Sequence, residues 1–158
     1  MRASDTTGAC ACGSGRAYAA CCEPFHAGGE PPDPVALVRS RYTAFVVGAP
    51  DYLVRTLHRD HDDLALSEGE LRARLRANAK RTRYHGLAVL DQDGPDADGT
   101  YRVLFRVEVS YDAKDASFVE LSSFVHDGHG LRYVGGITFA ARTAAGPSTI
   151  RIADVERR

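Results

Sequence analysis

The sequence lacks any long run of apolar residues, which excludes a membrane-spanning helix, since such a helix needs roughly 20 of them in succession. Its first ten residues, MRASDTTGAC, also lack the apolar stretch of a secretory signal. We therefore expect a cytoplasmic protein with no membrane partner.

The chain also lacks an excess of charge of either sign. It has 20 lysine and arginine residues against 21 aspartate and glutamate residues, which gives a formal net charge of -1. Such a balance does not favour a protein that seeks nucleic acid through its overall charge. The length of 158 residues and the hydrophobic fraction of 44% instead fit an ordinary globular protein of about one domain with a sizeable core.

No cysteine follows Cys22, and all four cysteines lie in the stretch CACGSGRAYAACC, residues 10–22. In a reducing cytoplasm, clustered cysteines are more often metal ligands or catalysts than disulfides. Disulfides within either close pair would also be strained. Zn²⁺ prefers a tetrahedron of thiolates, which two close pairs around a Gly-Ser-Gly turn can supply. We predict a closed, structural zinc site formed by Cys10, Cys12, Cys21 and Cys22.

Alternatives stay open at this site. His26 lies four residues after Cys22 and could replace one thiolate in a site of three cysteines and one histidine. A redox-active cysteine pair is another chemistry that such spacing allows. Arg16, next to the turn, could partly offset the negative charge of a four-thiolate site.

The stretch CACGSGRAYAACC resembles the SEC-C motif, in which Cys-x-Cys-Gly-Ser-Gly precedes a short basic-aromatic spacer and a Cys-Cys or Cys-His pair. The match includes both cysteine pairs, the turn and the aromatic Tyr18, with Ala11 in place of the usual proline. In the bacterial translocation motor that gave the motif its name, the zinc module contacts a chaperone and the ribosome. The resemblance therefore implies a zinc ion as cofactor and a protein partner of that kind.

The Gly/Pro-rich connector HAGGEPPDP predicts a boundary between the cysteine motif and a larger unit. We expect a motif with its linker over residues 1–30 and a main domain over residues 31–142. The remaining residues, 143–158, form a C-terminal tail or an extra edge strand in this interpretation.

Three helices are predicted at the start of the main domain. Asp33 can cap the first, which would begin at Pro34 and end at Gly48. Asp51 can cap a second, shorter helix. The third helix has both a capping box and an apolar stripe, formed by Ser67 with Glu70 and by Leu71, Leu75 and Ala79.

From Tyr84 the apolar period changes to two, which predicts strands over residues 84–92, 101–111, 118–126 and 131–139. A group of helices followed by a strand meander indicates an α+β fold, with helices packed on a curved antiparallel sheet. In the second strand, Val103 and Val107 share the face expected to be buried. Arg102 and Arg106 share the other face, which we expect to be largely wet.

The segments RSRYTAFVVGAPDYLVRTLH (39–58) and FVELSSFVHDGHGLRYVGG (118–136) resemble the YchJ-like family. In this uncharacterised bacterial group a SEC-C motif precedes a cone-shaped domain of the nuclear-transport-factor-two-like, or cystatin-like, kind. The resemblance implies that the main domain is such a cone domain. Family-typical residues of unknown role in it are Arg39, Arg41, Tyr42, Phe45, Tyr52, His58, Glu120 and Tyr133.

Domains of this shape often hold a pocket between helices and sheet. The polar residues expected near it are Tyr42, His58, Glu120 and Tyr133, and a histidine with a glutamate can do acid/base work. Plainer interpretations exist, since Tyr42 lies on an apolar helical stripe, His58 ends a helix and Glu120 can face water. No nucleophile, base and orienting group are recognisable together, so we assign no catalytic residue.

Two charged clusters carry weaker signals. HRDHDD, residues 58–63, could hold a second metal ion, but a solvated loop explains it better. A basic stripe on the third helix lacks interleaved aromatic residues, so we interpret it as an exposed face and expect no nucleic-acid partner. This stripe consists of Arg72, Arg76, Lys80 and Arg83.

Together these patterns predict a zinc-binding, non-catalytic adaptor or binding protein that works through protein-binding surfaces. The alternative is an enzyme or small-molecule binder that uses a pocket of the cone domain. In that case the zinc ion would only hold the N-terminal motif in place.

Overall fold

Over residues 34–140 the elements follow the predicted order, with helices before strands, and one further short helix comes after the last strand. The computed structural model describes residues 8–141 and 150–157. The helices are α1 (Glu23–His26), α2 (Pro34–Val47), α3 (Pro50–Arg55), α4 (Glu68–Arg81) and α5 (Ile152–Glu156), with 3₁₀ turns at Tyr18–Ala20 and Asp62–Ala65. The strands are β1 (Thr82–Asp93), β2 (Tyr101–Tyr111), β3 (Lys114–Asp115), β4 (Phe118–His126) and β5 (Leu131–Ala140). Within these ranges no helix is long and apolar enough to cross a membrane.

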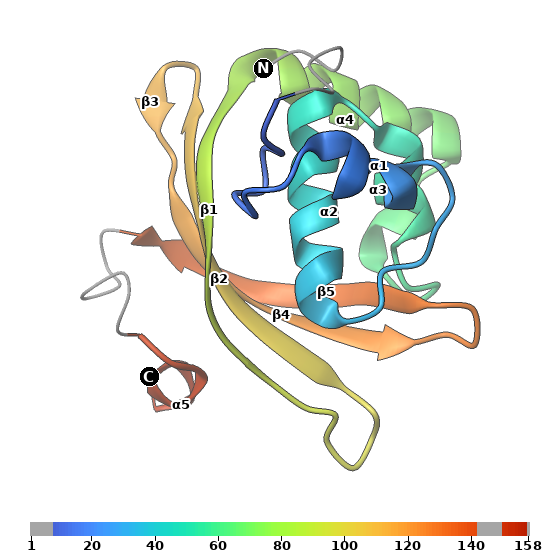
Figure 1. The fold of residues 1–158 in the computed structure, drawn as a ribbon, viewed down its shortest axis with the longest axis vertical. Coiled ribbons are helices and arrows are strands. Elements are labelled where there is room, and N and C mark those ends of the chain that lie inside the picture. Colours follow the sequence, from blue (N-terminus) through green and yellow to red (C-terminus); the bar gives the residue numbers. More distant parts are fainter. Residues whose placement is uncertain (1–7, 142–149, 158) are drawn as a thin grey trace.

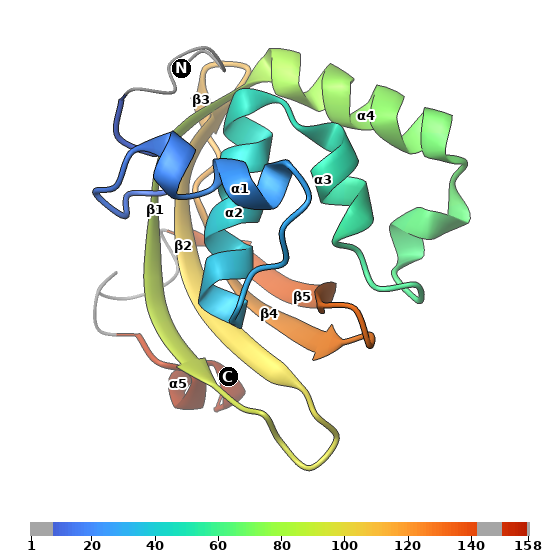
Figure 2. The same cartoon turned by 45° about the vertical axis from the view of Figure 1, so that its right-hand side comes forward.

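An antiparallel sheet with the strand order β1-β2-β4-β5 forms the body of the fold, and the short β3 pairs with β2. The sheet curves around α2, and α1, α3 and α4 lie on the same concave side, as Figure 1 and Figure 2 show. This arrangement confirms the predicted α+β fold, in which helices cover one face of a curved antiparallel sheet.

Helix α2 begins and ends where its sequence signals place it. The Asp33 carboxylate accepts a hydrogen bond from the backbone N–H of Ala36 at 2.8 Å, and Pro34 is the first helical residue. Gly48 ends the helix with a φ of 78°, a left-handed conformation that glycine adopts without strain. These signals act through neighbouring backbone groups alone, which is why the boundaries were predictable.

Helix α3 starts earlier than expected. It begins at Pro50 with Ala49 as the N-cap, so Asp51 lies in its first turn and does not cap it. Proline suits the first helical position because it has no N–H to leave unpaired. The prediction of Asp51 as the cap was therefore wrong, although its carboxylate still sits at the positive end of the helix.

Helix α4 has the predicted cap, and its predicted apolar stripe is buried only in part. The Ser67 hydroxyl accepts a hydrogen bond from the backbone N–H of Glu70 at 3.1 Å. Leu71 is buried, whereas Ala79 is exposed. The reason is a groove of about 440 Å³ between α4, the end of α2 and the start of β1, which Leu75 and Ala79 line.

The main core lies between the helices and the concave face of the sheet. Leu37 and Leu53 from the helices pack with Val103, Phe124 and Leu131 from the strands, and each is at most 5% exposed. The period of two in the second predicted strand thus identified its buried face correctly.

The alternation in β2 predicted a largely solvent-exposed convex face, and this prediction was wrong. Leu104 on this face is 0% exposed and packs with Val119 and Leu121 of β4. Ile150 and Ile152 from the C-terminal segment complete this second cluster. The prediction of an edge strand in residues 143–158 was also wrong for the described part, because residues 152–156 form the short helix α5; residues 142–149 and 158 lie outside the described range.

Candidate functional site

The four cysteines form one buried cluster at the N-terminal end of the described chain. Cys10, Cys12, Cys21 and Cys22 are each at most 5% exposed, and their sulfurs all lie within 4.8 Å of one another. The Cys12 and Cys21 sulfurs are 3.6 Å apart, and those of Cys21 and Cys22 are 3.9 Å apart. A tetrahedral Zn²⁺ with Zn–S bonds of about 2.3 Å places its sulfurs about 3.8 Å apart. The cluster therefore fits a four-coordinate metal ion.

A tight turn brings the two cysteine pairs together. Gly13 and Gly15 have φ values of 80° and 86°, which side chains beyond glycine rarely adopt. Around this turn the N–H of Cys10 donates to the carbonyl oxygen of Arg16 at 2.7 Å. The second pair then leads directly into α1, because Cys22 is the N-cap of that helix.

Hydrogen bonds and burial move the pKa values of the clustered cysteines in opposite directions. The Ser14 hydroxyl lies 3.1 Å from the Cys21 sulfur, and the Arg16 guanidinium donates to the same sulfur at 3.8 Å. A hydrogen bond from the Cys22 thiol lowers the pKa of Cys12 to about 4, against the effect of burial. The same interaction, together with burial, raises the pKa of Cys22. The Cys12 thiol thus ionises readily, whereas ionisation of Cys21 and Cys22 beside it is unfavourable. A bound cation would stabilise all of these thiolates together.

The cluster is packed against the cone domain through α2. The Cys10 sulfur lies 3.6 Å from the Thr43 hydroxyl, and the Arg39 guanidinium donates to the carbonyl oxygen of Cys12 at 2.6 Å. Tyr42 and Val107 of the cone domain belong to the same buried group of side chains. The cysteine loop, residues 10–22, therefore shares its contacts with the cone domain.

His26 lies outside this cluster, so the structure does not support it as the fourth ligand. Its Nε2 donates to the Ser40 carbonyl oxygen at 2.8 Å, and its Nδ1 accepts from the Tyr18 hydroxyl at 2.7 Å. Burial lowers the pKa of His26, which keeps the ring neutral in this arrangement. Both ring nitrogens thus make hydrogen bonds to groups other than the sulfurs. The spacing of His26 from Cys22 could not predict these hydrogen bonds.

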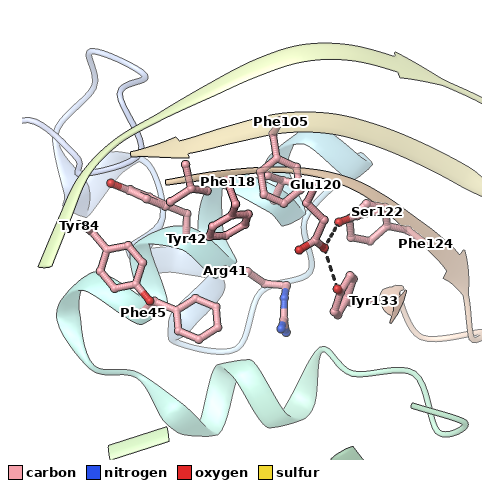
Figure 3. A pocket seen from close by; sticks show the side chains of 12 residues that line it. Arg41, Tyr42, Phe45, Tyr84, Phe105, Phe118, Glu120, Ser122, Phe124 and Tyr133 are labelled. Atoms are coloured by element: carbon pink, nitrogen blue, oxygen red, sulfur yellow. Dashed lines mark hydrogen bonds between the residues drawn. The ribbon is translucent and has the colours of Figure 1, made fainter. Parts of the chain in front are cut away.

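A cavity of about 190 Å³ lies between α2 and the concave face of the sheet. Seven aromatic side chains line it, together with Arg41, Glu120 and Ser122 as polar residues (Figure 3). Of the side chains expected near a pocket, Tyr42, Glu120 and Tyr133 are among those that line it. The cone interior is therefore partly hollow, with one carboxylate in its wall.

Neighbouring hydroxyl groups hold the Glu120 side chain in place. Its Oε2 accepts a hydrogen bond from the Tyr133 hydroxyl at 2.7 Å and another from the Ser122 hydroxyl. Burial and the negative charge of Glu120 raise the pKa of Tyr133, so this hydroxyl stays a donor. A Cβ atom at Gly136 would lie 2.6 Å from Oε2, so glycine on the neighbouring strand leaves the room that the carboxylate needs.

Arg41 supplies the positive charge at the cavity. Its Nη1 donates to the Leu53 carbonyl oxygen at 2.9 Å and to the Thr56 hydroxyl at 2.6 Å. Its guanidinium carbon lies 4.9 Å from the centre of the Tyr133 ring. Burial lowers the pKa of Arg41, and the nearby charge of Glu120 opposes this. The sequence analysis identified Arg41 only as a family-typical residue of unknown role. Its helical spacing from Val38 and Phe45 places all three on one face, and this spacing could have predicted that Arg41 lines the cavity.

His58 is not among the residues that line the cavity. Its backbone N–H donates to the Tyr133 carbonyl oxygen at 2.9 Å, and its ring lies beside the Asp60 carboxylate, at 3.7 Å. His61, from the same acidic loop, packs at an angle of 38° against the Tyr133 ring, with centroids 5.3 Å apart. Within residues 8–141 and 150–157 the cysteine cluster is the only group placed to hold a metal ion, so this loop does not form a second site.

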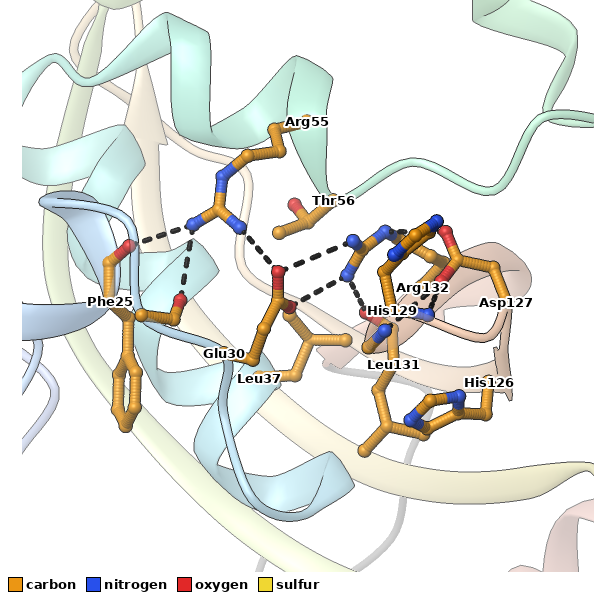
Figure 4. A network of polar contacts seen from close by, with 12 residues as sticks. Phe25, Glu30, Leu37, Arg55, Thr56, His126, Asp127, His129, Leu131 and Arg132 are labelled. Carbon is orange, nitrogen blue, oxygen red and sulfur yellow. Dashed lines mark hydrogen bonds and ion pairs between the residues drawn. The ribbon is translucent and has the colours of Figure 1, made fainter.

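An ionic network around the buried Arg132 joins the linker to the cone domain (Figure 4). Arg132, whose side chain is 7% exposed, donates to Glu30 of the linker at 2.9 Å and pairs with Asp127 at 3.0 Å. Glu30 also accepts from Arg55 of α3 at 2.8 Å. Sequence reasoning missed this network, because no local spacing relates Glu30 to Arg132, which are 102 residues apart.

Comparisons with known proteins agree with this description. The family model described as "YchJ, middle NTF2-like domain" matches residues 33–136. A SEC-C motif containing protein from Rhodopseudomonas palustris has a similar structure, with a TM-score of 0.68, 26% identity, and coverage of 82% of this chain and 98% of its own. A sec-c motif containing protein from Psychrobacter arcticus has a TM-score of 0.68 and 23% identity, with coverage of 83% and 82%, which shows a shared fold.

Proposed function

Because the chain belongs to the family of the YchJ middle NTF2-like domain and packs a cluster of four cysteines against that domain, we propose that it is a zinc-stabilised, non-catalytic binding protein. The observation that carries this proposal is the closed geometry of the cluster. All four thiols are buried and mutually close, so four protein sulfurs fill a tetrahedral coordination sphere. A metal ion held in this way has no open position for water and serves structure.

Cobalt substitution tests the structural role directly, since Zn²⁺ is d¹⁰ and has no d–d absorption whereas Co²⁺ reports on its ligands. We expect the Co²⁺-loaded full chain to show the intense visible bands of a tetrahedral thiolate site. These bands should not change on addition of imidazole or azide. A spectrum that shifts with either ligand would reveal an open coordination position and contradict the proposal.

Two variants identify the fourth ligand in the same measurement. Cys22→Ser should weaken the sulfur-to-cobalt charge-transfer absorption by about a quarter, because one of four thiolates is lost. His26→Gln is the matched control and should leave the spectrum unchanged, because both its ring nitrogens are bonded elsewhere. The reverse pattern would assign the ligand to His26.

We also propose a protein-docking role for the motif, with the ribosome as the first partner to test. The motif exposes Arg16 and three small side chains, Ala17, Ala19 and Ala20. Small side chains leave the backbone of the loop accessible to a partner, and the exposed Arg16 offers a positive charge for acidic groups of a ribosomal protein. These exposed residues are the part of the motif that a partner can reach while the metal ligands stay buried.

Cosedimentation with purified bacterial ribosomes checks this docking role. The wild-type chain should pellet with ribosomes at low salt, and the double variant Ala19→Glu/Ala20→Glu should remain in the supernatant. Ala73→Glu/Ala77→Glu, on the exposed face of α4, is the control for added negative charge and should still pellet. Equal behaviour of the two variants would show that the motif is not the contact surface.

A second candidate function is the binding of a small molecule in the cone domain. The observation that favours it is the cavity of about 190 Å³, which has a carboxylate in an otherwise mostly aromatic wall. A carboxylate in such a wall is costly to bury unless its oxygens are hydrogen-bonded. Proteins that need only a packed core rarely place one there, whereas ligand pockets typically combine apolar walls with a few fixed polar groups.

A further inference from the structure

The two oxygens of the Glu120 carboxylate differ in their hydrogen bonding. Oε2 accepts from Tyr133 and Ser122. Among the described residues, no hydrogen bond or ion pair reaches Oε1, and Figure 3 shows both dashed lines meeting the same oxygen amid the aromatic rings. A carboxylate oxygen accepts hydrogen bonds and cannot donate them when ionised. A ligand that satisfies Oε1 must therefore bring a donor.

The charges in the cavity wall determine what net charge a ligand can have. Arg41 and Glu120 contribute one positive and one negative charge, and within the described residues they form no direct ion pair with each other. Arg41 is instead held by Leu53, Thr56 and the Tyr133 ring. The wall is balanced as it stands, so a ligand with a net charge would leave an uncompensated charge among mostly apolar side chains. An uncharged ligand avoids this cost.

The volume and the lining of the cavity determine the size and the apolar character of a ligand that fits it. A cavity of about 150 Å³ with apolar walls is known to accommodate benzene. The volume here is about 190 Å³, which leaves room for one ring and one small substituent. Phe105, Phe118 and Phe124 are among the rings that would contact such a ligand, and aromatic pairs favour offset or edge-to-face packing.

We propose that the cavity binds an uncharged, ring-sized organic molecule that donates one hydrogen bond to Oε1 of Glu120. This inference rests on the second candidate function, because it names the ligand class of the same cavity. Glu120 acts as the specificity-determining residue, and the aromatic side chains supply most of the contact area. Arg41 balances the charge of Glu120 and thereby disfavours both cations and anions.

Four ring-sized probes test the ligand class on the wild-type full chain. Phenol is uncharged at pH 7 and has a donor, toluene has none, benzoate is an anion and benzylammonium is a cation. Methyl-detected NMR titrations should place bound phenol beside Val38 and Val107, which line the cavity. We expect phenol to bind about tenfold more tightly than toluene, the effect of a hydrogen bond to a charged acceptor. Benzoate and benzylammonium should bind more weakly than phenol.

Glu120→Gln tests the assigned residue while keeping the side-chain size. Phenol should lose most of its advantage over toluene, and benzoate should gain affinity because Arg41 is then unbalanced. A merely structural role of Glu120 would not reverse the order of charged probes. Glu108→Gln, on the convex face of the same sheet, is the matched control and should bind all four probes as the wild type does.

The outcomes separate the two claims. If no probe binds, the cavity is not a ligand site, and both the second candidate function and this inference are overturned. If toluene binds as tightly as phenol, the cavity binds ligands without polar recognition, and only the inference is overturned. Tightest binding of benzylammonium or of benzoate would likewise assign a charged ligand class and refute the inference. The comparison of probes on the wild-type chain decides these outcomes even if Glu120→Gln fails to fold.

Discussion

Cys12→Ser should abolish stoichiometric zinc binding and lower the melting temperature of the whole chain by about 10 °C or more. Cys12 is 0% exposed, and its sulfur lies 3.6 Å from that of Cys21. A serine hydroxyl fits the space but is a poor ligand for Zn²⁺ beside three thiolates. The folded chain would therefore lose the free energy that metal binding contributes to its stability.

The loss should reach the cone domain, because the cysteine loop shares its buried cluster with that domain and has no separate core. Arg39 and Thr43 of α2 bond to the loop directly, and His26 bonds to Ser40 of the same helix. Removing the metal therefore loosens side chains that also pack on the cone domain. A loss of about 3 kcal/mol in the free energy of unfolding corresponds to about 10 °C in a chain of this size.

Calorimetry and metal analysis of the same samples check this prediction. The wild-type chain should carry about one zinc ion per chain and melt in a single transition. Ala19→Ser, an exposed substitution in the same loop, should change neither value. A metal-free wild-type chain that melts at the same temperature would contradict the structural zinc. Unchanged melting of the cone domain in Cys12→Ser would show that the loop and the cone domain are energetically independent.

Local signals in the sequence were enough to predict much of the fold. Asp33 and Gly48 mark the ends of α2 through bonds to their own neighbours, and the period of two in β2 follows from the pleat. The cysteine spacing predicted the four-cysteine cluster that could hold a metal ion for the same reason, because all four cysteines lie within one short loop. Each of these signals is complete within a few residues of the chain.

Features that depend on distant segments could not be predicted. Leu104 shares its face of β2 with two arginines, so the sequence predicted an exposed face. Ile150 and Ile152 from the distant C-terminal segment pack with Leu104 and bury it. His26 has a suitable spacing from the cysteines, yet its ring is committed to Ser40 and Tyr18. In both cases the partner is chosen by tertiary packing, which spacing does not encode.

The largest destabilisation by charge removal should come from the network around Arg132. The double variant Glu30→Gln/Asp127→Asn should lower the free energy of unfolding by about 3 kcal/mol at pH 7. It leaves the guanidinium of Arg132, whose side chain is 7% exposed, without a carboxylate partner. We take the lower end of the usual range because the Glu30 side chain is 35% exposed and partly screened by water.

A triple variant separates an unpaired charge from lost packing. Adding Arg132→Met to the double variant removes the buried charge and keeps a side chain of similar length. Stability should then recover to within about 1 kcal/mol of the wild type, because apolar replacements of buried ion pairs are often neutral. Urea denaturation of the three proteins measures both steps. A triple variant as unstable as the double variant would show that hydrogen bonding and packing, not the buried charge, account for the loss.

The same network predicts how stability depends on pH. Hydrogen bonds from Arg132 hold the pKa of Glu30 below its usual range, and the pKa of Asp127 is lowered despite burial by the N–H groups of His129 and Gly130. The folded chain thus binds these protons less tightly than the unfolded chain. Their stabilising effect is complete above the unfolded pKa values of about 4 and is lost as the pH falls through the lowered folded values. The difference in the free energy of unfolding between the wild type and Glu30→Gln/Asp127→Asn should therefore be constant from pH 6 to 8 and shrink below about pH 4. A difference that stayed the same down to pH 2.5 would exclude charge pairing as its origin, because protonated carboxyl groups no longer compensate Arg132.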